Sequence, residues 1–187
     1  MQDNDQALAS QANLPAATEP TYSGVLSLFR RQYSKHIGDA DIVTFGIPYD
    51  LSVTNRPGTR FGPRAIRDVS TNLSWTGAAW PWGFDPFEHL RMIDYGDLRL
   101  DPGYPHTMLD AIYQQTTAVL EQAPFLIAMG GDHSVSYPLI KAHAEKHGPL
   151  ALIQFDAHSD TWAEDEKRID HGTMFYHAIQ ELSLIHI

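Results

Sequence analysis

The segment 156–160, with the sequence DAHSD, carries three side chains that could bind a metal ion. It directly follows an apolar run, 150–155, which is typical of a strand covered on both faces. Alternate side chains of extended backbone point to the same side, so Asp156, His158 and Asp160 can converge on one point. A divalent ion held by carboxylates and imidazoles can activate water for hydrolysis.

A second motif, GGDHS at 130–134, follows another apolar run, 125–129. Its paired glycines allow a tight turn that brings His133 to the same pocket. Ligands of open parallel sheets bind beyond the carboxyl ends of the strands, where both motifs lie. The excess of carboxylates favours Mn²⁺ or Mg²⁺ over copper and leaves zinc open, and we choose manganese. A carboxylate bridging two ions about 3.5–4 Å apart would let them lower the pKa of a shared water toward roughly 7.

The elements that must position these motifs alternate between short apolar runs and helical patterns, which predicts an α/β fold with a mostly parallel sheet. Strands are predicted at 41–47, 90–94, 125–129 and 150–155. Helices are predicted from Pro63 to Val69, from Pro105 to Glu121 and from Tyr137 to Lys146. Four arginines lie near the start of the first helix: Arg56, Arg60, Arg64 and Arg67. They suit ion pairs within the fold or between subunits better than a phosphate site.

Composition narrows the function further. The 187 residues are 43% hydrophobic and 19% charged, as in a soluble globular domain. Thirteen basic against 23 acidic residues give a net charge of −10, which argues against nucleic acid and anionic membranes and favours a small cationic partner. The chain has no cysteine, which excludes disulfides and thiolate metal sites. Without an apolar run of roughly 18 residues or a secretory leader, we expect a cytoplasmic protein.

Three regions are expected along the chain. Residues 1–21 are polar and nearly devoid of large apolar side chains, which predicts a disordered tail. Residues 22–181 are predicted to form the N-terminal part of a single domain. Residues 182–187, LSLIHI, can be back-translated to CTG TCT CTT ATA CAC ATC, which matches a transposon-end sequencing adapter. We therefore expect this tail to be non-native and the natural frame to continue differently.

The two metal motifs resemble the signatures of the arginase/agmatinase ureohydrolase family. The likeness extends from Asp41 to about Glu181. The segment NRPGTRFGPRAIR at 55–67 resembles the family's N-terminal loop, and VSTNLSW at 69–75 and DHGTMF at 170–175 are similar to agmatinases in particular. The resemblance implies a three-layer α/β/α fold with a binuclear Mn²⁺ site that hydrolyses a guanidinium group to urea and an amine.

Site residues carried over by position complete this expectation. His133, Asp156 and Asp160 would bind one ion, and Asp156 and His158 the other, with Asp156 bridging. His171 would match the family's active-site histidine, which helps to move protons to the leaving amine. The resemblance also suggests a homo-oligomer.

The substrate expected from the resemblance is agmatine. The segment 161–170 lacks the Ser-Gly-Asn loop with which arginases bind the amino-acid end of arginine, and instead carries Glu164, Asp165 and Glu166. Alternatives are a guanidinobutyrase- or arginase-type ureohydrolase, or an inactive fragment. The family's later Asp-x-Asp motif and substrate-binding glutamate do not occur before residue 187. We therefore expect this chain by itself to be inactive.

Overall fold

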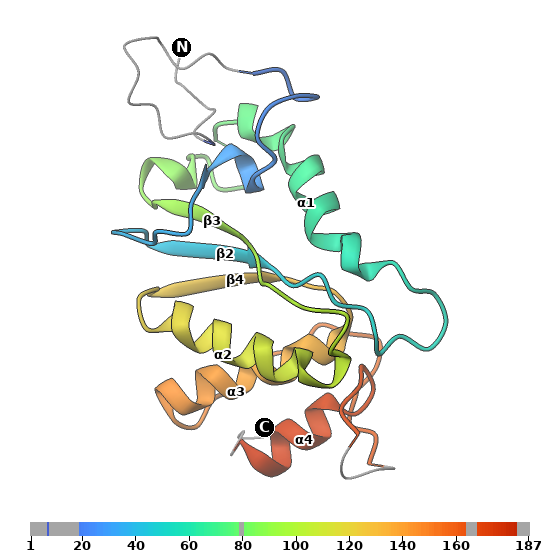
Figure 1. Cartoon of the computed structure of the whole chain (residues 1–187). Helices are drawn as coiled ribbons and strands as arrows, with labels where there is room; N and C mark the ends of the chain where they lie inside the picture. The colour runs from blue at the N-terminus through green and yellow to red at the C-terminus, as the bar shows by residue number, and fades with distance from the viewer. Residues whose placement is uncertain (1–6, 8–18, 79–80, 164–167, 183–187) are drawn as a thin grey trace. The chain divides into compact units, whose positions relative to one another are not determined.

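The computed structural model of the chain describes residue 7 and the ranges 19–78, 81–163 and 168–182. The chain forms two compact units, each built from three stretches of sequence. The first unit comprises 1–46, 61–97 and 123–129, and the second comprises 47–60, 98–122 and 130–187. The strands belong to the first unit, and both metal motifs belong to the second. Figure 1 labels β2, β3 and β4 of the first unit and α2, α3 and α4 of the second.

A parallel sheet forms the first unit. Its strands are β1 (Gln32–Tyr33), β2 (Ile42–Gly46), β3 (Met92–Asp97) and β4 (Phe125–Met129), in the order β1-β3-β2-β4. β2 pairs in parallel with β3 and β4, with Val43 opposite Ile93 on one side and Leu126 on the other. The α/β class with a mostly parallel sheet is thus confirmed, as are three of the four predicted strands. β1 was not predicted, because two residues are too short to show a period.

The core of the first unit lies around β2. Val43 and Phe45 are fully buried, and both lie on β2, which has a strand on either side. Helix α1 (Gly62–Ser70) begins with Pro63 in its first turn, as predicted, and packs against β2 and β4.

Arg67 of α1 is held by two carboxylates of the first unit. Its Nε and Nη2 donate to Asp94 at 2.6 and 2.9 Å, and its Nη1 donates to Asp97 at 2.6 Å. Asp94 is fully buried and also accepts from the backbone N–H groups of Leu28 and Gly96. The prediction of ion pairs within the fold is therefore confirmed for this arginine.

The α-helices in the described part of the second unit are α2 (Met108–Leu120), α3 (Ser136–His147) and α4 (Met174–Glu181). α2 packs against α3, and Tyr113 of α2 donates a hydrogen bond to Glu145 of α3. Apolar side chains of α3 and α4 form a core, with Met174 and Ala178 fully buried. Full burial of a side chain as large as Met174 contributes about 1.5–3 kcal/mol. The predicted helices at 105–121 and 137–146 are thus confirmed to within a few residues.

Short 3-10 helices complete the chain: η1 (Leu28–Arg30), η2 (Thr59–Phe61), η3 (Leu73–Trp75), η4 (Pro86–Glu88), η5 (Pro105–Thr107) and η6 (His133–Val135). Among the described residues, no helix combines the length and the apolar character needed to cross a membrane.

The fourth predicted strand, 150–155, is wrong in this structure. Only Ala151 makes a strand-type bridge, and Ile153 and Phe155 are 80% and 97% exposed. Without a ladder of hydrogen-bonded neighbours, apolar sequence alone does not form a strand. The predicted boundaries at 21 and 181 stay predictions. Most of the 1–21 tail and residues 183–187 lie outside the described residues, while Leu182 is described and packs against the α3–α4 core.

Candidate metal centre

A tight turn after β4 presents His133. Gly131 has a φ of +65°, and a Cβ there would lie 2.5 Å from the carbonyl oxygen of Ile47, so only glycine fits without displacing backbone. Asp132 then caps η6: its Oδ1 accepts from the N–H of Ser134 at 3.0 Å and from the Ser134 hydroxyl. Such a cap satisfies N–H groups that the first turn leaves without partners. The side chain of His133 therefore projects from a turn that the Asp132 cap holds in one conformation.

The DAHSD segment is held to the start of α4. The N–H of Phe175 donates to the carbonyl oxygen of Asp160 at 3.1 Å, and the N–H of Trp162 donates to that of Gly172 at 2.9 Å. Asp160 has a φ of +50°, a conformation that aspartate tolerates better than most residues. These bonds bring Asp160 to His133, although 26 residues separate them along the chain.

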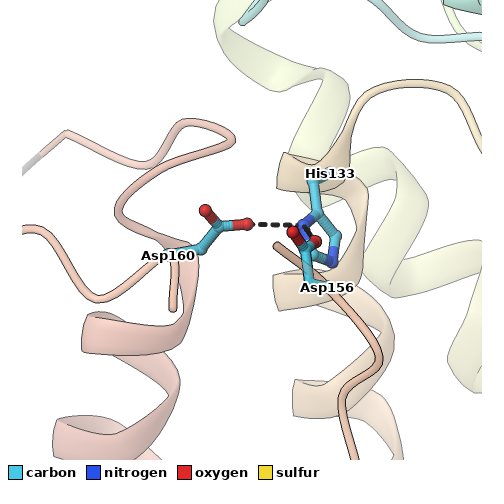
Figure 2. A group of neighbouring side chains, drawn as sticks. All are labelled: His133, Asp156 and Asp160. Atoms are coloured by element: carbon cyan, nitrogen blue, oxygen red, sulfur yellow. Dashed lines mark hydrogen bonds and ion pairs between the residues drawn. The ribbon is translucent and has the colours of Figure 1, made fainter. Parts of the chain in front are cut away.

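Three ligand-type side chains meet at this point. His133 Nδ1 lies 2.6 Å from Asp160 Oδ2 and 3.3 Å from Asp156 Oδ2. Figure 2 shows the two carboxylates turned toward the imidazole ring. The side chains of His133, Asp156 and Asp160 are 32%, 25% and 10% exposed, so the group is open to solvent on one side. The ring of Phe175 packs against the His133 ring edge to face, at 5.4 Å between centroids, and limits its rotation.

This donor set fits a hard divalent cation. One atom from each residue lies within 4.8 Å of the others, and two ligands about 2.1 Å from one ion would lie roughly 3–4 Å apart. Two carboxylates supply two negative charges, and one imidazole completes a set that suits Mn²⁺ or Mg²⁺. The backbone N–H of His158 donates to Asp156 Oδ1 and lowers the pKa of the Asp156 carboxyl below its ordinary 3.8. Asp156 is therefore ionised at neutral pH, as a ligand must be.

His158 lies apart from these three residues. Its side chain is 81% exposed, and Nδ1 lies 3.6 Å from Asp156 Oδ1. Because 156–160 is not a regular strand, the alternation expected to place Asp156, His158 and Asp160 on one side does not apply. The role of His158 as a ligand of a second ion stays a prediction, as do the ligand roles of His133, Asp156 and Asp160.

His171 lies half-buried at the turn before α4. Asp170 shapes this turn by accepting from the N–H of Gly172 at 2.9 Å. The Nδ1 atom of His171 contacts the backbone carbonyl oxygen of Ser52. A carbonyl oxygen can only accept, so Nδ1 carries the proton and the neutral ring has a bare Nε2. The acidic residues at 164–166, which we expected to attract a cation, lie outside the described residues.

Sequence reasoning missed two residues that shape the centre. Asp132 belongs to a metal motif, yet both its carboxylate oxygens are used by the N–H groups of Ser134 and Ser52. The Asp-x-Ser spacing at the head of a helical turn is a capping signal that could have revealed this role. Ser52 acts through its backbone, which no side-chain pattern can show.

Comparisons with known proteins agree with the arginase-like resemblance. A model of the arginase family matches residues 40–187. The agmatinase of Chromobacterium violaceum is 48% identical over 179 residues, which are 95% of this chain and 55% of that protein. The crystal structure of a hypothetical agmatinase from Burkholderia thailandensis is similar with a TM-score of 0.88 and 43% identity, over 97% of this chain and 57% of that one.

A formiminoglutamase from Trypanosoma cruzi, solved with Mn²⁺, has a TM-score of 0.64 and 27% identity, over 81% of this chain and 51% of that one. These likenesses confirm the arginase-like α/β fold. The chain spans about half the length of the relatives it matches.

Proposed function

Because the chain belongs to the arginase family, we propose that it contributes to the hydrolysis of the guanidinium group of agmatine to urea and putrescine, a step of polyamine biosynthesis. The observation that carries the proposal is the convergence of His133, Asp156 and Asp160 on a common point. The 48% identity to an agmatinase supports agmatine as the substrate. The net charge of −10 suits a cationic substrate.

We propose Mn²⁺ as the metal, two ions per complete site. The hard donor set and the manganese in the related formiminoglutamase structure support this choice. When bound, the metal would supply a water activated for attack on the guanidinium carbon. His133, Asp156 and Asp160 would hold one ion, and Asp156 with His158 would hold the other, which requires His158 to turn inward.

In this proposal the protein's residues position the metal and move protons. Asp156 and Asp160 provide the negative charge that holds a divalent ion, and Phe175 keeps the His133 ring in place. His171 would take up a proton from the attacking water at its bare Nε2, because Nδ1 is committed to the carbonyl oxygen of Ser52. Transfer of that proton from Nε2 to the leaving amine would complete the release of putrescine.

The test is urea release by a chimera. In the chimera, residues 1–181 of this chain would replace the part of the C. violaceum agmatinase that aligns with them. Agmatine would be offered together with Mn²⁺. We expect urea release that is lost in His158→Asn and after removal of the metal. Full activity of a metal-free sample, or an inactive but folded and metal-loaded chimera, would contradict the proposal.

Two alternatives are separated in the same assay. Guanidinobutyrate or arginine consumed faster than agmatine would indicate a ureohydrolase of another specificity. Urea release by the chimera but none by the 187-residue chain would indicate that the chain itself is inactive. We also propose that the protein is cytoplasmic and forms a homo-oligomer. Light scattering on the chimera would test the oligomeric state.

A further inference from the structure

The Ser52 peptide is bonded on both sides to the candidate centre. Its N–H donates to Asp132 Oδ2 at 2.9 Å, and its carbonyl oxygen accepts from His171 Nδ1. Asp132 is 5% exposed and immediately precedes His133. The Ser52 peptide therefore links the turn that carries His133 to His171, the candidate proton-transfer histidine.

The loop that carries Ser52 is fixed independently of these two bonds. The N–H of Asp132 donates to the carbonyl oxygen of Tyr49 at 2.8 Å, which ties the loop to the turn a second time. The buried carboxylate of Asp50 accepts from the N–H of Gly58 at 2.7 Å and from Arg60 Nε at 2.6 Å. Because both ends of the loop are held, loss of one bond to Ser52 would change its peptide orientation without releasing the loop.

We propose that Asp132 is a positioning residue that acts through the Ser52 peptide to hold His171 with Nδ1 protonated and Nε2 free. The inference rests on the proposed function, in which Nε2 of His171 exchanges a proton. Both carboxylate oxygens of Asp132 serve the protein, since Oδ1 caps η6 and Oδ2 accepts from the N–H of Ser52.

The physical basis is a chain of polarised hydrogen bonds. A carboxylate that accepts from a peptide N–H draws charge along the peptide and makes its carbonyl oxygen a stronger acceptor. The tautomer of a histidine is set by the hydrogen bond that one of its nitrogens makes. Asp132→Asn would turn one of the two acceptor oxygens into a donor amide, which cannot accept from Ser52 or from Ser134.

The experiment is nuclear magnetic resonance of the ring nitrogens in the 187-residue chain labelled with ¹⁵N-histidine, without metal. His171→Gln identifies the signals of His171. In the wild-type chain we expect the ring to be protonated at Nδ1. In Asp132→Asn we expect the ratio of the two tautomers to shift by about fivefold or more toward Nε2 protonation. Ser52→Ala keeps the backbone bonds and is the matched control, with an unchanged ratio.

A wild-type His171 protonated at Nε2, or an unchanged ratio in folded Asp132→Asn, would overturn the inference. Should Asp132→Asn fail to fold by circular dichroism, the wild-type chain decides alone. Its ring must be protonated at Nδ1 and its Ser52 amide must exchange slowly with solvent; a freely exchanging amide contradicts the proposal. These spectra need no catalysis, so failure of the urea assay and failure of this inference are separate results.

Discussion

Replacement of Asp160 by asparagine should weaken Mn²⁺ binding by the 187-residue chain. The change keeps the shape of the side chain and removes one of the two negative charges in the donor set. A unit charge about 3 Å from a doubly charged ion contributes about 2.8 kcal/mol in water and about 11 kcal/mol at an effective dielectric constant of 20. The Asp160 side chain is 10% exposed, so its surroundings lie between these limits.

Part of this loss of Mn²⁺ binding energy is offset by a change in the metal-free chain. There Asp160 accepts a charge-assisted hydrogen bond from His133 at 2.6 Å, which the metal must displace. Asparagine weakens that competing bond as well. We therefore expect a loss at or below the lower end of the range, an affinity for Mn²⁺ about 10- to 100-fold lower, since each 1.4 kcal/mol corresponds to a factor of ten.

The measurement is a titration in which electron paramagnetic resonance reports free Mn²⁺. Asp110→Asn is the matched control, because Asp110 is exposed on α2 and makes its side-chain bond to Gln114. It changes the net charge equally, and its effect should stay below about twofold, since salt screens distant charges. If Asp160→Asn binds Mn²⁺ as tightly as the wild-type chain, the three-residue centre does not hold the ion and the reasoning fails.

Further predictions concern stability in urea titrations. Gly131→Ala should lower the free energy of unfolding by about 1–3 kcal/mol, because the backbone has a positive φ there and a new Cβ would lie 2.5 Å from a carbonyl oxygen. Gly77 is exposed with open space around it, so Gly77→Ala should change stability little. Arg67→Met should cost about 3–5 kcal/mol, because it leaves the carboxylate of Asp94 buried without its partner; a cost below about 1 kcal/mol would contradict this. The hydroxyl of Tyr137, in α3, donates to Glu181 and lowers the pKa of that carboxyl below its ordinary 4.5. The folded pKa is thus depressed, so this stabilisation is complete above pH 4.5 and is lost as the pH falls through the folded pKa. Glu181→Gln should remove that part of the acid sensitivity, by less than about 1 kcal/mol because the side chain is half exposed.

Periodicity was sufficient to predict most of the helices and strands. β2 and β4 are short apolar runs between turns, and the buried residues of α2 recur at helical spacing, including Ile112, Thr116 and Val119. These elements are determined locally, by side chains that repeat at the period of the backbone. The sequence also predicted that His133 meets Asp156 and Asp160, but it predicted this from strand alternation, which 156–160 does not have in the structure.

Strand alternation was expected to place Asp156, His158 and Asp160 on one side. The structure brings Asp160 to His133 through a turn with positive φ, fixed by backbone bonds to Gly172 and Phe175. Backbone carbonyl and N–H groups carry no residue-specific signal, so neither these bonds nor the role of Ser52 could be predicted from spacing.

The exposed run 150–155 explains why His158 stands away from the centre. Strand geometry would turn Asp156, His158 and Asp160 to one side, but it requires neighbouring strands that hold the backbone extended. Among the described residues, β4 pairs only with β2, and the run makes no ladder. Asp160 still reaches His133 because the N–H of Phe175 in α4 holds its backbone, whereas the His158 side chain is 81% exposed. A strand partner for 150–155 would therefore do two things at once: it would bury Ile153 and Phe155, which are 80% and 97% exposed, and it would impose the alternation that turns His158 toward Asp156. Formation of the proposed second metal position and burial of this apolar run are, on this argument, a single structural event.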